Sequence, residues 1–324
     1  MKHISVLVPK GDVAVASIEG PYKMFSHVNE FLQREGKPPA FKIELVGFSR
    51  ESLLDNGMYT LNTHRTLADS FKTDLIFIPA VHGDFKKVIK QNYEMTQWVA
   101  NQYKQGAEIA SLCVGAFLLA STGLLQGKKC ATHWLFANDF RKMFPEVNLV
   151  AEKIITDECG IYSSGGAYSF LNLLLYLVEK YVGRDMAILC AKIFEIEVDR
   201  GSQSPFTIFN GQKDHDDESI KKAQSFIENN FQQKITVDQL ASMLALSRRN
   251  LERRFKKATS NTTVEYIQRV KIEAAKISLE SSRENVNEVM YKVGYTDSKA
   301  FRVTFKKITG LSPVQYRSRY SRLN

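Results

Sequence analysis

The last third of the chain contains an internal repeat, which constrains the fold more than any other feature of the sequence. Residues 240–247 correspond to residues 289–296, and residues 255–259 correspond to residues 305–309 with one additional residue in the second copy. Between Ser219 and Tyr320 the only proline is Pro313, and apolar residues recur at spacings of three and four, which is typical of helices. The pattern predicts an all-α domain built from two helix-turn-helix units.

Each copy predicts a second helix with a buried apolar side and a basic outer side. We expect this helix to begin at Ser247 in the first copy and at Asp297 or Ser298 in the second, with Thr236 as the N-cap of the helix before it. Apolar residues four apart should face inward: Leu251 and Phe255, then Phe301 and Phe305. The outer side is expected to carry Arg248, Arg249, Asn250, Arg253 and Arg254 in the first copy, and Ser298, Lys299 and Arg302 in the second. Arginine and asparagine make bidentate contacts with guanine and adenine in the major groove, so this surface predicts DNA binding.

Positive charge is concentrated in the same region. The whole chain has a net charge of +9, yet from Ser219 onward there are 21 Lys+Arg against 9 Asp+Glu. Such asymmetry is expected of an attached nucleic-acid-binding domain. Lysines at the ends of the two predicted helices suit phosphate contacts: Lys256, Lys257, Lys306 and Lys307.

The C-terminal motifs resemble the AraC/XylS family of bacterial transcription regulators. The likeness covers residues 219–320 and is most specific at Gly310-Leu311-Ser312-Pro313, followed by Tyr316-Arg317. It implies two helix-turn-helix units joined by a long helix, here residues 264–279. The family's base contacts carry over to Arg249, Glu252 and Arg253 in the first unit, and to Ser298, Lys299 and Arg302 in the second. One position departs from the family, because Val303 stands where an arginine is usual.

The first two thirds of the chain alternate short apolar runs with amphipathic segments. Strands are predicted at residues 4–8, 41–46, 74–79 and 108–112, and helices at residues 20–35, 93–105, 115–121, 166–181 and 184–198. This βαβ rhythm predicts a parallel sheet covered on both faces by helices. We therefore expect an α/β domain over residues 1–205, a linker over residues 206–218, and the all-α domain over residues 219–324.

A cysteine directly follows the last of these strands. Residues 108–112 lead into Cys113, Val114 and Gly115, after which a helix of small residues begins. A strand, a sharp elbow and a helix project a thiol over a helix N-terminus, where a nucleophile can be activated. His133 follows twenty residues later and is a candidate partner for the thiol.

This first region resembles the class I glutamine amidotransferase-like superfamily, in its PfpI-type branch, and implies a flavodoxin-like fold. The likeness rests on five motifs: Glu19-Gly20-Pro21, residues 110–120, Ala131-Thr132-His133-Trp134, Ser163-Ser164-Gly165-Gly166, and residues 183–187. Enzymes of this superfamily pair the elbow cysteine with a histidine and often with a carboxylate after the first strand. That position falls near Ala16 here, and Glu19 lies three residues later, so the carboxylate is missing.

Three interpretations of the cysteine elbow follow. The first is a sensor pocket, formed by Cys113, His133, Val114 and Glu19, that binds a small-molecule effector in a homodimer. The second is a cysteine hydrolase or amidase tethered to DNA, using Cys113 and His133. The third is plain packing of a buried cysteine. Because the carboxylate is missing, we expect the sensor rather than an enzyme, with no metal and no cofactor.

The sequence as a whole predicts a sequence-specific DNA-binding transcription regulator, with promoter DNA, an effector and RNA polymerase as partners. No apolar run reaches the about 18 residues of a membrane span, and the N-terminus shows no signal-peptide pattern. The four cysteines form no CxxC pair, which favours a reducing compartment. We therefore expect a location in the bacterial cytoplasm, on the nucleoid when the protein is bound to DNA.

Overall fold

The computed structural model describes residues 1–54, 57–198 and 201–321. The chain divides into two compact units, Met1–Gln203, with one hydrophobic core, and Ser204–Asn324, with two. Within the described residues, no helix is both long enough and apolar enough to cross a membrane.

A seven-stranded sheet forms the centre of the first unit. Its strand order is β12-β13-β9-β7-β1-β3-β6, and every neighbouring pair is parallel except β12 and β13. The strands are β1 (Lys2–Val8), β3 (Phe41–Gly47), β6 (Arg65–Thr66), β7 (Leu75–Ile78), β9 (Glu108–Ser111), β12 (Ile155–Glu158) and β13 (Ile161–Ser164). Placing β1 between β3 and β7, with β9 and β13 beyond, is the flavodoxin-like order, which confirms the predicted α/β fold.

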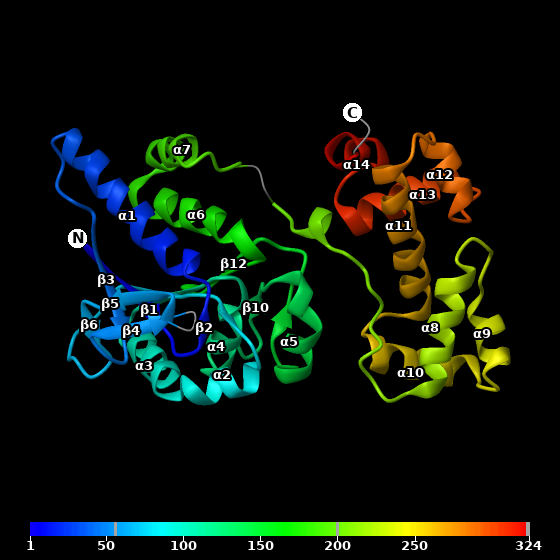
Figure 1. The fold of residues 1–324 in the computed structure, drawn as a ribbon, viewed down its shortest axis with the longest axis horizontal. Helices are drawn as coiled ribbons and strands as arrows, with labels where there is room; N and C mark the ends of the chain where they lie inside the picture. Colours follow the sequence, from blue (N-terminus) through cyan, green and yellow to red (C-terminus); the bar gives the residue numbers. More distant parts are fainter. Residues whose placement is uncertain (55–56, 199–200, 322–324) are drawn as a thin grey trace. The chain divides into compact units, whose positions relative to one another are not determined.

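Helices cover both faces of this sheet (Figure 1). On one face lie α1 (Ala16–Arg34), α6 (Phe170–Val182) and α7 (Arg184–Ile193). The other face carries α2 (Phe85–Gln91), α3 (Tyr93–Lys104), α4 (Ala116–Ser121) and α5 (Ala137–Met143). All four residues of β7 are buried, as expected for a strand covered on both sides. Short two-stranded pairs complete the unit: β2 (Asp12–Val13) with β8 (Val81–His82), β4 (Glu51–Leu54) with β5 (Tyr59–Asn62), and β10 (Lys129–Cys130) with β11 (Asn148–Leu149).

The predicted strands and helices of this unit all occur, with ends displaced by a few residues. The largest displacement is at α7, which ends at Ile193 rather than at residue 198. Several elements were not predicted, among them helices α2 and α5 and the hairpin of β12 and β13 at the edge of the sheet.

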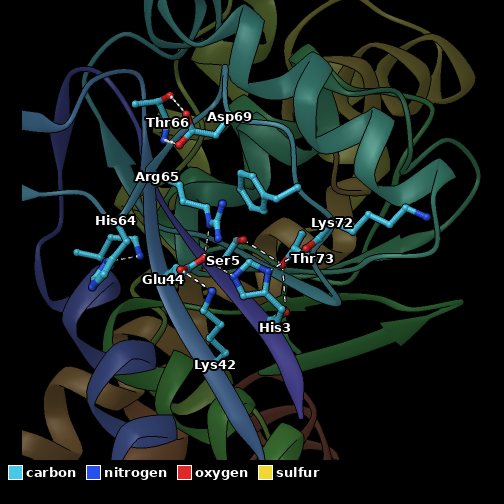
Figure 2. Close-up of polar contacts among 12 residues, drawn as sticks. His3, Ser5, Lys42, Glu44, His64, Arg65, Thr66, Asp69, Lys72 and Thr73 are labelled. Atoms are coloured by element: carbon cyan, nitrogen blue, oxygen red, sulfur yellow. Dashed lines mark hydrogen bonds and ion pairs between the residues drawn. The ribbon is translucent and has the colours of Figure 1, made fainter.

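An ionic cluster connects the strands near the other edge of the sheet, away from the β12–β13 hairpin, where β3 lies between β1 and β6 (Figure 2). Glu44 on β3 accepts from His3 Nε2 at 2.7 Å, Lys42 Nζ at 2.8 Å and Arg65 Nε at 2.5 Å. Burial alone would raise the pKa of the Glu44 carboxyl, but these three donors together lower it to about 2. The carboxylate therefore stabilises β1, β3 and β6 as neighbours throughout the physiological pH range.

The second unit is entirely helical in its described residues apart from its loops. Its helices are α8 (Glu218–Asn230), α9 (Val237–Met243), α10 (Arg248–Thr259), α11 (Thr263–Ser281), α12 (Val286–Lys292), α13 (Ser298–Thr309) and α14 (Pro313–Tyr320). The long helix α11 connects two small cores, one shared with α8, α9 and α10, the other with α12, α13 and α14 (Figure 1). The predicted inward residues Leu251, Phe255, Phe301 and Phe305 are all buried in these cores.

The predicted helix starts are confirmed by their caps. Thr236 Oγ1 accepts from the Gln239 backbone N–H at 3.1 Å, and Ser247 Oγ accepts from that of Asn250 at 3.3 Å. In the second copy Asp297 is the cap, accepting from Lys299 N at 2.7 Å. These bonds satisfy backbone donors that have no partner within the helix.

The tight turn differs between the two copies. Ala245 and Gly294 both adopt positive φ angles, 52° and 74°. A Cβ atom at Gly294 would lie 2.2 Å from the Gln232 carbonyl oxygen, so only glycine fits there. The turn between α12 and α13 thus lies directly against the segment that follows α8.

Candidate nucleic-acid interface and cysteine elbow

Helix α10 presents the predicted base-contacting residues of the first copy on its outer side. Arg249 and Arg253 are exposed, and Glu252 is half-buried beside them. The Arg253 guanidinium donates to Asn250 Oδ1 at 3.0 Å, which holds both side chains on the same surface. Lys256 and Lys257 are exposed at the end of the helix, next to this surface.

Two other arginines of α10 are held in ion pairs, so the free basic surface is smaller than predicted. Arg248 reaches Asp238 on α9 at 3.1 Å. Arg254 donates from Nε and Nη2 to the two carboxylate oxygens of Asp217, at 2.8 and 2.5 Å, and this pair lowers the pKa of Asp217. Asp217 also caps α8, so Arg254 connects α10 to the start of α8 and is half-buried there rather than free on the outer surface as predicted.

Helix α13 presents a second basic side. Lys299, Arg302, Lys306 and Lys307 are exposed, and Ser298 is half-buried at the first turn. Val303 lies among them and is 61% exposed. Both copies of the repeat therefore present an outer helix surface with cationic residues, but with different residues at its centre.

In the first unit, Cys113 occupies the predicted elbow after β9. Its φ angle is +55°, a conformation that non-glycine residues rarely adopt. Gly115 makes the elbow possible, because a Cβ atom there would lie 2.6 Å from the carbonyl oxygens of Ile78 and Pro79 at the end of β7. The helix that follows can therefore pack closely against the sheet.

The thiol of Cys113 is surrounded by backbone groups. Its side chain is buried, and burial raises the pKa of the thiol, although the N–H groups of Ala167 and Val114 point at the sulfur and oppose the shift. The Cys113 backbone N–H donates to Ser164 Oγ at 3.2 Å, and its carbonyl accepts from Thr132 Oγ1 at 3.0 Å. A buried neutral thiol is a poor nucleophile.

His133 and Cys113 both contact the loop over residues 165–167. Gly166 lies directly against the His133 ring, because a Cβ atom at Gly166 would be only 2.9 Å from it. The backbone N–H of the next residue, Ala167, donates toward the Cys113 thiol. His133 Nδ1 accepts the Leu135 backbone N–H at 3.1 Å. Burial, and then the neighbouring His82, lower the pKa of His133. The structure brings Cys113 and His133 to one loop, but each side chain is bonded to backbone groups.

The remaining predicted pocket residues differ in their surroundings. Val114 is fully buried at the elbow, and Glu19 is exposed on α1. A residue that sequence reasoning missed is Gln203, which is 1% exposed. Its amide donates to the carbonyls of Thr132 and Lys153 and accepts from the N–H of Gly166, so it positions the loops on both sides of His133. No local pattern marks this glutamine, since its partners lie far away in the sequence.

Comparisons with known proteins agree with this arrangement. Residues 32–180 match the DJ-1/PfpI family, and residues 240–319 match a helix-turn-helix domain. The HTH-type transcriptional regulator GbdR of Pseudomonas aeruginosa is 24% identical over 68% of this chain, and the chain spans 60% of the length of that relative. The HTH-type transcriptional regulator CdhR of the same species is 23% identical over 82% of this chain and 78% of its own length.

Among solved structures, a putative transcriptional regulator protein from Vibrio parahaemolyticus covers 59% of this chain and 98% of its own, with a TM-score of 0.53 and 24% identity. At this identity the likeness shows the fold alone. The fold and the two family matches lead to one conclusion: this chain joins a DJ-1/PfpI domain to an AraC-type helix-turn-helix domain.

Proposed function

We propose that the protein is a sequence-specific DNA-binding transcription regulator. The observation that carries the proposal is the pair of repeated helices, α10 and α13, each capped at its start and each exposing cationic side chains opposite a buried apolar side. A helix of this kind enters the major groove with its N-terminal residues toward the bases. The relatives GbdR and CdhR carry the name of transcriptional regulators, which supports the same function for this chain.

The exposed residues of the two helices have different proposed roles. In the first helix-turn-helix copy Arg249 and Arg253 contact guanine bases, and Glu252 accepts from a cytosine amino group. In the second copy the base contacts come from Ser298, Lys299 and Arg302. Four lysines contact phosphates and supply affinity without sequence preference: Lys256, Lys257, Lys306 and Lys307.

The test is to measure binding of the full-length protein to a duplex obtained by in vitro selection. Arg249→Ala and Arg253→Ala should each weaken binding to the selected sequence by about 1–3 kcal/mol and relax the preference at one base pair. Lys257→Ala should instead weaken binding to all sequences equally and reduce the salt dependence. The exposed Lys222 on α8 supplies a matched control, since Lys222→Ala should leave the preference unchanged. Equal affinity of wild type and both arginine variants would contradict the assignment of α10.

We further propose that the DJ-1/PfpI domain is an effector-binding and dimerisation domain rather than an enzyme. In doubly wound sheets ligands bind beyond the carboxyl ends of the strands, which is where Cys113 and His133 lie. The proposed pocket adds Val114 and Glu19 to these two residues. An effector would change DNA binding or contacts with RNA polymerase if it binds one arrangement of the dimer more tightly than another. The raised pKa of Cys113 argues against the hydrolase alternative, which needs a thiolate.

A further inference from the structure

The internal repeat allows the two DNA-facing helices to be compared position by position. Residues 298–309 of α13 align with residues 248–259 of α10 at a constant offset, as the shared Phe-Lys-Lys segment shows. Lys299 corresponds to Arg249, and Lys306 and Lys307 correspond to Lys256 and Lys257, so these positions remain cationic in both copies. Val303 corresponds to Arg253 and Ala300 to Asn250, so two hydrogen-bonding residues of the outer surface are replaced by apolar ones, of which Val303 is the larger.

Val303 lies within the cationic surface of α13 rather than at its margin. Lys299 is four residues before it and Lys307 four residues after it, so one cation lies a helical turn away on each side. The Phe301 and Phe305 side chains point into the core, which leaves Val303 directed outward with 61% of its surface exposed. Single exposed valines are common on proteins, and Val314 on α14 is another, at 66%. Val303 differs from Val314 because it is placed among the residues that face DNA.

An apolar side chain in the major groove has one favourable partner among the base edges, the C5-methyl group of thymine. We propose that Val303 reads a thymine through this methyl group, so that the first helix recognises bases by hydrogen bonds and the second by an apolar contact. This inference rests on the proposed DNA-binding function. It makes Val303 a specificity-determining residue: the neighbouring lysines hold the helix in the groove, and valine selects thymine at the position it faces.

Deoxyuridine provides a direct test, because it differs from thymidine only by the missing methyl group. A duplex is first selected with the full-length wild-type protein, and each thymine in it is then replaced singly by deoxyuridine. At one position the replacement should weaken wild-type binding about fourfold, the value expected for losing the burial of one methyl group. Val303→Ala should bind the thymine duplex more weakly and should no longer distinguish it from the deoxyuridine duplex. Val303→Arg should change the preferred base at that position from thymine to guanine.

The control is Val314→Ala, which removes a similarly exposed valine outside α13 and should retain the full thymine preference. The proposal is overturned if every deoxyuridine replacement leaves wild-type affinity unchanged while Arg249→Ala and Arg253→Ala still weaken binding. It is equally overturned if Val303→Ala keeps the wild-type sensitivity to deoxyuridine. A selection that enriches no sequence at all would instead contradict DNA recognition by the protein as a whole.

Discussion

At the scale of single residues, Cys113 shows how the fold determines the chemistry of a side chain. The elbow and the N–H groups of Ala167 and Val114 are typical of activated cysteines, yet burial dominates and raises the pKa of the thiol. Less thiolate is therefore present at neutral pH than for a free cysteine. We expect iodoacetamide at pH 7.5 to alkylate Cys113 at least tenfold more slowly than the exposed Cys159, with the Cys113 rate rising as the pH is raised toward and above 9.

Mass spectrometry of labelled peptides measures both rates in one sample, so Cys159 serves as an internal control. Cys130 should be slower still, because burial raises its pKa to about 12. Rapid and selective labelling of Cys113 at neutral pH would contradict this prediction and favour the hydrolase alternative.

At the scale of elements, a buried lysine fixes how the two helix-turn-helix units meet. Lys271 on α11 donates from Nζ to the carbonyls of Gln233, Val293 and Gly294, at 3.2, 3.0 and 3.1 Å. Its charged group thus holds the segment after α8 against the end of α12, where helix carbonyls lack partners. Lys271→Met should cost about 2 kcal/mol by leaving buried carbonyls unbonded. In full-length protein, amide hydrogen exchange in α12 should become about 30-fold faster.

The same substitution at the exposed Lys222 should change exchange in α12 by less than about twofold, because a surface lysine makes no buried bonds. If the amides of α12 are as protected from hydrogen exchange in Lys271→Met as in the wild type, then apolar packing alone joins the two helix-turn-helix copies.

Sequence periodicity located most elements, but it could not locate contacts between distant segments. The apolar runs and caps predicted the strands around β7 and the helices α10 and α13, because those signals are local. The β12–β13 hairpin was not predicted, because its short strands contain polar residues such as Asp157 and Ser163 and therefore form no apolar run. In the candidate site, Cys113 and His133 were found from an elbow and a spacing. Gln203 was not found, because its function depends on backbone groups that only folding brings together.

At the scale of the whole molecule, the segment between the predicted domains belongs to the second unit. The structure divides the chain after Gln203, whereas composition suggested a linker over residues 206–218. The Thr207 carbonyl accepts from Lys276 at 2.6 Å, and the Phe209 N–H donates to Glu273 at 3.1 Å. The Phe209 and Tyr266 rings pack edge to face, with their centroids 5.1 Å apart. The segment thus packs along α11 and contacts both helix-turn-helix units.

This packing predicts where a stable fragment of the helical unit must begin. Residues 204–324 should have a free energy of unfolding in urea about 2 kcal/mol higher than residues 216–324, because the shorter fragment keeps the Asp217 cap of α8 but loses the packing of Phe209 and the bonds around it. Phe209→Ala in the longer fragment should remove most of the difference, and Lys222→Ala should remove none. Equal free energies of unfolding for the two fragments would show that the segment does not stabilise the helical unit. If the difference is found, a change in the first unit that displaces this segment would alter the packing that holds α10 and α13, which would give the proposed effector a physical route along the chain.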